Sequence, residues 1–396
     1  MYSEYSSLSH SFSSPAAMAD VLKGVNLLET LKNSMERNRL SEVKDAVEDL
    51  LISSLNLAVV GERSEEKMAF INSLHGVSAA DEGAACSSSV PTEDLSCYPN
   101  PVHPDFRLWD LPPVPIGLPF EPDVYMNAVK FLRYNVVFLM VTQTPPPSVV
   151  ALVLRARLLQ LQTVYLILLV SDKDQNPDSK RRASVDALRS HGVTQSKVYL
   201  VSPSALETLD FPALLEDLAK DLPEIRWCAL LMALPTLTAA LVIQKKEAFG
   251  ALVWAAASLS GGVSAVPVPF VASAVDSSMA VRVLCKVQAS LCLDDASVER
   301  LARRRGLEPA RLKALRACPL STEVTKAEVK RRLALAEKDC STLSSRLVQM
   351  AVPRHARSAG RSFAAMLNAL KTAIDDMAAD AEKILASAFA ETSQNA

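Results

Sequence analysis

The pattern of apolar and polar residues divides the chain into three regions. From residue 18 to residue 52, apolar residues recur at helical spacing with charged residues between them, as in amphipathic helices. Between residues 52 and 225, short runs that are almost wholly apolar alternate with helical patterns. The runs are 55–60, 106–109, 135–141, 164–170 and 198–201, and the helical patterns are 67–74, 124–133, 149–161, 179–191 and 211–222. After Pro223, helical patterns continue and strand-like runs cease.

The middle region predicts an α/β fold. Strands that are apolar on both faces need cover on both faces, and their alternation with helices is typical of a doubly wound parallel sheet. We predict such a domain at 52–225. A second, all-α domain is predicted from both ends of the chain, with N-terminal helices at 18–51 and a C-terminal part at 226–390. The Ser-rich segment 1–17 is predicted to be disordered, and 391–396 to form a short tail.

One stretch of the C-terminal part is unusually apolar. Residues 248–275 carry no charge over 28 positions, which is long enough to cross a bilayer. The stretch also contains two adjacent glycines and two prolines, which disfavour a continuous membrane helix. Three interpretations remain open: packing inside a soluble helical domain, a hairpin inserted shallowly into a membrane, and a membrane span.

Composition narrows the range of functions. Basic residues number 42 and acidic residues 44, so the net charge of -2 argues against a general nucleic-acid binder. The seven cysteines are dispersed and include no C-x-x-C pair, which argues against a disulfide scaffold or a zinc ribbon and favours a reducing compartment. The N-terminus has no signal-peptide pattern, so a cytoplasmic location is expected.

The first apolar run and the helix after it have the layout of a phosphate-binding loop. Gly61 and Lys67 match the G-x4-G-K-[ST] motif, but Glu66 replaces its second glycine and Met68 its hydroxyl residue. A carboxylate about 5 Å from a phosphate would repel it by about 3 kcal/mol at an effective dielectric constant of about 20. Met68 offers no hydroxyl for Mg²⁺. The layout of a nucleotide site is present, while its chemistry is damaged.

Longer matches point to a family. FRLWDLP at 106–112, DFPALLEDLAKDLP at 210–223 and VERLARRRGLEPARLKAL at 298–315 resemble segments of the immunity-related GTPases, which are interferon-inducible relatives of the dynamin-like GTPases. EGAA at 82–85 and CYPNP at 97–101 resemble the switch region of that family. The resemblance extends from about residue 20 to 390, and with its broken loop the chain looks most like the Q-type, or quasi-GTPase, branch.

The resemblance implies a set of nucleotide-binding positions, several of which are altered. Asp110 matches the acidic residue of the D-x-P-G motif, but Pro113 replaces its glycine and has no N–H for a γ-phosphate. Asp174 matches the base-binding aspartate of the [NT]KxD motif, while Asp172 stands in place of its lysine. Thr92 falls near the Mg²⁺-binding switch threonine, in a segment that departs from the family's usual sequence.

Simpler interpretations of the same residues stay open. Lys67 could form a salt bridge with Glu66 or be exposed at the start of a helix. Asp174 could stabilise a turn, since it lies in a segment rich in Asp and Asn. No catalytic residue is assigned.

The altered motifs favour a pseudo-GTPase that acts as an interaction or adaptor protein in cell-autonomous innate immunity or autophagy. GTP or GDP with Mg²⁺ is then expected to bind weakly or not at all. The alternative is an active, membrane-associated, dynamin-like GTPase in which Lys67, Asp110 and Asp174 suffice. A third hypothesis is a membrane-bound structural protein that uses 248–275 as its anchor.

Partners are expected to be proteins, either other members of the family or autophagy factors, and not nucleic acid. The family resemblance also implies peripheral attachment to endomembranes. Phe363, Met366, Leu367 and Leu370 share one face of a C-terminal helical pattern among basic residues. They are candidates for membrane contact, or for packing in a helix bundle.

Two short segments carry a further ambiguity. Residues 210–214 (DFPAL) fit the loose motif by which peptides bind ubiquitin-like autophagy modifiers, and they also match a structural helix of the family. Arg303, Arg304 and Arg305 could attract phosphates or anionic lipid, or could form a solvated helix face.

Overall fold

The computed structural model describes residues 31, 33–34, 37, 39–52, 54–61, 64–85, 95–115, 119–171, 174, 176–193, 197–264, 269–342 and 360–390, without the side chains of residues 40, 260–276, 339–342 and 360–363. Within these residues, six strands form one sheet in the order β2-β3-β1-β4-β5-β6. The strands are β1 Leu55–Val60, β2 Ser96–Pro99, β3 Phe106–Leu111, β4 Val136–Val141, β5 Val164–Leu169 and β6 Val198–Val201. All neighbours are parallel except β2, which runs antiparallel to β3 at the edge. The predicted α/β fold is confirmed.

The sheet separates two hydrophobic cores. Successive strand residues point to opposite faces, so in β1 Leu57 and Val59 enter one core while Ala58 and Val60 enter the other. Helices α4 (Glu65–His75) and α8 (Phe211–Asp221) cover the first face. Helices α5 (Pro122–Ala128), α6 (Pro147–Leu158) and α7 (Pro177–Ser190) cover the second. This double cover explains why the strands read as continuous apolar runs.

Two local features do not follow from the periodicity. Strand β2 alternates half-buried and exposed residues at the edge, and its four residues are too few to give a strand signal. The helical pattern at 124–133 divides into α5 and the 3-10 helix η1 (Phe131–Arg133). The division lies at Lys130, whose φ of 52° is left-handed and cannot continue an α-helix.

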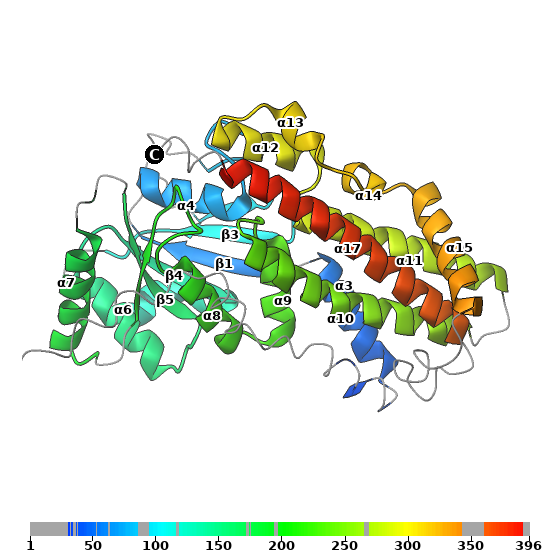
Figure 1. Cartoon of the computed structure of the whole chain (residues 1–396). Helices are drawn as coiled ribbons and strands as arrows, with labels where there is room; N and C mark the ends of the chain where they lie inside the picture. Colours follow the sequence, from blue (N-terminus) through cyan, green and yellow to red (C-terminus); the bar gives the residue numbers. More distant parts are fainter. Residues whose placement is uncertain are drawn as a thin grey trace, which may run out of the picture.

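The remaining helices form an elongated bundle beside the sheet (Figure 1). They are α3 Leu40–Ile52, α9 Glu224–Ala233, α10 Ala239–Ser264, α11 Pro269–Ser290, α12 Asp295–Arg305, α13 Pro309–Lys313, α14 Pro319–Thr322, α15 Lys326–Thr342 and α17 Gly360–Ala390. Helix α3 contacts α9, α10 and α11, so both ends of the chain build the helical part, as predicted. Helix α17 packs along α10, α11 and α15, and its C-terminal end contacts α12. Its residue Phe389 stacks under the guanidinium of Arg305, 3.8 Å from the ring centre.

The uncharged stretch lies inside this bundle as far as its side chains are described. Helix α10 contacts α3, α9, α11 and α17. Its residues 251–257 are buried throughout. A helix that is surrounded on all sides can be apolar all round without meeting lipid. Of the helices in the described part of the chain, none is both long and apolar enough to cross a membrane.

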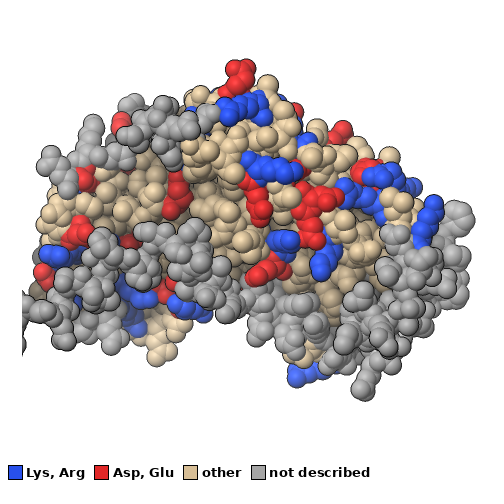
Figure 2. All heavy atoms as spheres, viewed as in Figure 1, with Lys and Arg blue, Asp and Glu red and all other residues tan. Residues whose placement is uncertain are grey.

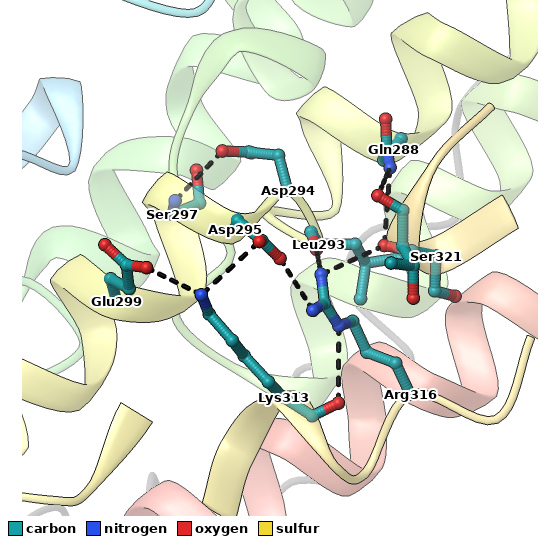
Figure 3. Close-up of polar contacts among 10 residues, drawn as sticks. Gln288, Leu293, Asp294, Asp295, Ser297, Glu299, Lys313, Arg316 and Ser321 are labelled. Carbon is teal, nitrogen blue, oxygen red and sulfur yellow. Dashed lines mark hydrogen bonds and ion pairs between the residues drawn. The ribbon is translucent and has the colours of Figure 1, made fainter. Parts of the chain in front are cut away.

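A polar network fixes the corner between α11, α12 and α14. Figure 3 shows the guanidinium of Arg316 between Asp295, the carbonyl of Leu293 and the carbonyl of Ser321, at 2.6, 2.9 and 3.5 Å. Lys313 donates to Glu299 at 2.6 Å and pairs with Asp295 at 3.4 Å. The network satisfies the carbonyl of Leu293, which follows α11, and that of Ser321 within α14. It therefore accounts structurally for two charges of the 298–315 segment, Glu299 and Lys313.

The arginine cluster of α12 joins the bundle to the sheet domain. Arg303 pairs with Asp81 at 2.8 Å, Arg304 donates to the carbonyl of Val77 at 3.2 Å, and Arg305 pairs with Glu207 at 2.8 Å. Asp81 and Val77 follow α4, and Glu207 precedes α8. The cluster is therefore not merely a solvated face: Arg303 and Arg305 pair with acids across the junction, and Arg304 donates to a carbonyl there.

Candidate functional site

The strand order creates a switch point between β1 and β4. After β1 the chain continues to β2 and β3 on one side, whereas β4, β5 and β6 lie on the other. In open α/β sheets, ligands bind at such a point, outside the carboxyl ends of the strands. A cavity of about 300 Å³ lies here, lined by the ends of β1 and β4, the segment 142–144, Pro113 and the start of α4. Its position is that of a nucleotide site.

The turn from β1 into α4 is held by two close contacts. Ser64 caps α4, and its Oγ accepts the backbone N–H of Lys67 at 3.2 Å. Gly61 passes so near β4 that a Cβ added to it would lie 2.6 Å from the carbonyl oxygen of Met140. A glycine is therefore required at position 61 for the approach of two backbones.

Replacing Gly61 with alanine is expected to destabilise the protein by about 1–3 kcal/mol, because the backbone oxygen that it meets cannot move away without shifting β4. The matched control is Gly250→Ala in α10, where the added Cβ meets nothing within 4 Å. That change should stabilise by about 0.5–1 kcal/mol through helix propensity. Urea unfolding of both variants measures the two effects, and equal effects would contradict the steric argument.

Lys67 is buried and already bonded on every side. Its side chain is 2% exposed, and Nζ lies 2.5 Å from Oδ1 of Asp110. It also donates to the carbonyls of Gly61 at 2.9 Å and Leu111 at 3.4 Å. The ammonium therefore forms one ion pair, with Asp110, and donates hydrogen bonds to two backbone carbonyls. Neither simple interpretation of Lys67 holds, since it is not exposed and its carboxylate partner is Asp110.

The start of α4 carries its own negative charge. Glu65 and Glu66 occupy the first turn, where the helix dipole would otherwise favour a phosphate. Met68 is buried in the core, so no side chain at the magnesium position reaches the cavity. Both departures from the loop motif thus act as structural residues of the helix.

The cavity itself offers little to a phosphate. Its described lining has polar side chains only at Ser64, Thr142, Gln143 and Thr144, and none of them is charged. Pro113 is one of the lining residues, and the carbonyl of Pro112 beside it accepts the hydroxyl of Tyr125 at 2.6 Å. The three polar residues after β4 were missed in the sequence, although their place beyond the carboxyl end of a strand is a recognisable signal.

The other predicted nucleotide contacts are separate or outside the description. Asp174 accepts the backbone N–H of Ser171 at 2.9 Å and forms an ion pair with Lys180. The hydrogen bond from Lys180 lowers the pKa of Asp174 below its usual value. These contacts agree with the turn interpretation of Asp174. Thr92, Asp172 and Lys173 lie outside the described residues.

The hydrophobic face of α17 packs inward. Met366 and Leu370 are each 1% exposed in the core, and Leu367 is partly buried against it. The side chain of Phe363 lies outside the described residues. In this structure the face is therefore a bundle contact, and membrane contact through it would require α17 to leave the bundle.

The autophagy-modifier motif at 210–214 is also inaccessible. Phe211 and Leu214, its two anchoring residues, lie on α8 and are buried in the core. Asp210 accepts the backbone N–H of Leu200 at 2.9 Å. The structural-helix interpretation of this segment holds, because the anchors would reach a partner only if α8 unfolded.

Comparison with known proteins identifies the family. A family model described as Interferon-inducible GTPase matches residues 24–145 and 170–388. The chain belongs to the interferon-inducible GTPase family. Its relatives include Interferon-inducible GTPase 5 of Rattus norvegicus, 30% identical over 400 residues that cover 95% of this chain and 86% of that protein. The Bos taurus protein of the same name is 30% identical over 394 residues, covering 94% of this chain and 84% of that protein.

A more distant relative matches a smaller part of the chain. Interferon-inducible GTPase 1 of Mus musculus is 25% identical over 304 residues, covering 73% of each chain. The segments of this chain that match the family model include Gly61, Lys67 and Asp110. The family implies GTP or GDP as the ligand of the switch-point site. The residues present there fit such a ligand poorly, since the loop lysine is engaged and the described lining has no cation.

Proposed function

We propose that this member of the interferon-inducible GTPase family is a pseudo-GTPase that acts as an adaptor in cell-autonomous innate immunity or autophagy. The observation that carries the proposal is that the buried Lys67 side chain already pairs with Asp110. Its ammonium, which would contact the β- and γ-phosphates in a working loop, is instead neutralised by Asp110 in a buried pair.

Nucleotide binding would have to break this pair. A phosphate that took Lys67 would leave the Asp110 carboxylate buried beside it, and Glu66 would lie at the same helix end. Each carboxylate at about 5 Å would repel a phosphate charge by about 3 kcal/mol at an effective dielectric constant of about 20. Met68 gives Mg²⁺ no hydroxyl to offset this repulsion. GTP is therefore expected to bind weakly or not at all.

The proposed partners are proteins, other members of this family or autophagy factors, met in the cytoplasm and at the surface of endomembranes. The charge distribution supports a protein partner over a nucleic acid. On the face seen in Figure 2, acidic and basic side chains are interspersed over the helical part. Arg331 and Arg332, for example, both pair with Glu328. A polyanion would need an uncompensated basic stripe.

One observation favours an active GTPase as the second candidate. Gly61, Lys67 and Asp110 come together at the switch point beside a cavity of about 300 Å³. That volume is at the lower end of the range for small-molecule sites, roughly 300–1,000 Å³. If Asp110 can release Lys67 when GTP arrives, the site could still bind nucleotide.

Titration of the purified chain with a fluorescent GTP analogue in Mg²⁺ distinguishes the two candidates, with GDP and ATP as competitors. The proposal predicts no saturation up to about 1 mM, weaker than roughly -4 kcal/mol. Micromolar, guanine-selective binding would overturn it and favour the active GTPase.

A variant with Glu66→Gly and Pro113→Gly serves as the matched comparison. Both changes restore residues of the expected motifs at positions outside the hydrophobic cores. Binding by this variant alone would trace the loss to these two residues. Absence of binding in both proteins would leave the Lys67–Asp110 pair and Met68 as the causes.

A further inference from the structure

A second, smaller cavity lies at the junction of the sheet domain and the helical part. Its volume is about 60 Å³. It is lined by the end of α4, the loop between β2 and β3, the end of α9 with the following segment 234–237, the end of α11, and α12. Pockets for nucleotides or drug-sized ligands start at roughly 300 Å³, so only a small ligand fits.

The ionisable side chains among the described lining residues are two arginines and two histidines. Arg300 and Arg304 reach it from α12, His75 from the last residue of α4, and His103 from the loop before β3. Asn100, Thr236 and Ser297 add neutral polar groups. Among the described lining residues there is no Asp or Glu. Such a lining suits an anion.

Two of these basic groups have unused hydrogen-bonding capacity. His75 is 5% exposed, and its Nε2 is a buried atom without a hydrogen-bond partner. Nε of Arg300 is likewise buried and without a partner, although another nitrogen of this guanidinium donates to Ser297 at 2.8 Å. Buried polar atoms are nearly always satisfied in folded proteins, so two orphans at one cavity call for a ligand.

Two buried lysines contact residues that line the cavity. Lys245 is fully buried and donates to the carbonyls of Leu234 and Ser290 and to Oγ1 of Thr236, at 2.6, 2.5 and 2.9 Å. Lys286 contacts Nδ1 of His103 at 2.9 Å. No carboxylate in the described part of the chain forms an ion pair with either lysine. Burial lowers the pKa of Lys245 to about 8 and that of Lys286 to about 7.

The acids whose charges reach Lys286 and Arg304 are committed to other cations. Asp105, whose charge reaches Lys286, pairs with Arg107 at 3.1 Å. Asp81 and Glu207, whose charges reach Arg304, pair with the neighbouring Arg303 and Arg305 at 2.8 Å each. The basic cluster therefore lacks an internal counter-ion. A cluster of buried cations without one is costly, and an anion in the cavity would relieve that cost.

We propose that this junction cavity binds one small tetrahedral oxyanion, inorganic phosphate or the phosphate of a monoester, between His75, His103, Arg300 and Arg304. The anion would accept from the two guanidinium groups and from His75 and would neutralise part of the charge of Lys245 and Lys286. Because its ligands come from both the sheet domain and α12, it would also hold the two parts together. This site is independent of the switch-point cavity.

Isothermal titration calorimetry with inorganic phosphate tests the proposal, in chloride buffers of constant ionic strength. We expect one site per chain with a Kd below about 1 mM. Arg300→Gln and Arg304→Gln should each weaken binding about tenfold, since each removes charge-assisted hydrogen bonds. Glycerol 3-phosphate in a parallel titration separates the two sources, because a free phosphate site excludes the ester and a monoester site accepts it.

Arg303→Gln is the matched control, because Arg303 lies on the same helix but pairs with Asp81 outside the cavity. Its phosphate affinity should stay within about twofold of the unchanged protein. Arg304→Lys keeps the charge and should retain most of the affinity, which guards against a variant that merely fails to fold. Absence of phosphate binding to the unchanged chain, or binding that persists in both Arg→Gln variants, would overturn the proposal.

Discussion

Replacing Lys67 with alanine is expected to lower the free energy of unfolding by about 3–5 kcal/mol, because it leaves the buried Asp110 carboxylate without its counter-charge. The change also removes the donor to the carbonyls of Gly61 and Leu111. Urea unfolding monitored by circular dichroism measures the loss. A loss below about 1 kcal/mol would show that the pair contributes no more than a surface ion pair.

A double variant separates the charge effect from the packing effect. Lys67→Met with Asp110→Leu removes both charges while keeping apolar volume, and it should recover a large part of the stability that either single change loses. Lys180→Ala is the matched control. It breaks another lysine–aspartate pair, with Asp174, in which the lysine side chain is 35% exposed, and it should cost about 1 kcal/mol or less.

This expectation changes how a functional test of Lys67 is interpreted. In a working phosphate-binding loop, loss of the lysine is a probe of nucleotide dependence. Here the same substitution is expected to destabilise the fold, so lost activity in a Lys67 variant would not by itself show that the protein uses GTP. The direct titration of the unchanged chain avoids this ambiguity.

The second large effect is a loss of stability in acid. Burial lowers the pKa of His75 to about 4, and burial together with the charges of Lys286 and Lys245 lowers that of His103 to about 2. Both folded-state pKa values lie below the unfolded value of about 6.5. The neutral histidines therefore stabilise the fold above about pH 6.5, and this stability is lost as the pH falls toward 4.

For His75 alone the difference amounts to about 3 kcal/mol by the relation of about 1.4 kcal/mol per pKa unit. Urea unfolding at several pH values between 7.5 and 4.5, in phosphate-free buffers, would measure it. The variant His75→Gln removes the titrating ring and should show a shallower decline with falling pH. Parallel pH profiles for the variant and the unchanged chain would exclude His75 as a source of the acid sensitivity.

The sequence alone predicts most of the architecture, because the signals that determine it are local. Apolar runs such as Leu55–Val60 and helical periodicities are visible within single segments, and their alternation decides the class of sheet. The same applies to the family, since the motifs that carry it are contiguous. Short elements such as β2 have too few residues to give a periodic signal, and they were missed for that reason.

The state of the candidate site could not be predicted in the same way. The partner of Lys67 is 43 positions away in the chain, and the two meet because the parallel register of β1 and β3 pairs Val59 with Asp110. The spacing of residues in the sequence does not predict which residues of β1 and β3 lie side by side. From the sequence alone, the adjacent Glu66 is the plausible ion-pair partner of Lys67.

The sequence by itself thus determined the α/β sheet, the helical part built from both chain ends, and the departures from the nucleotide motifs. Only the tertiary structure decided that Lys67 pairs with Asp110. It also decided that Met366 and Leu370 face the bundle core, and that Arg300, Arg304 and His75 line one cavity. The reason is physical. Periodicity states which face of an element avoids water, and only packing between distant elements states what that face touches.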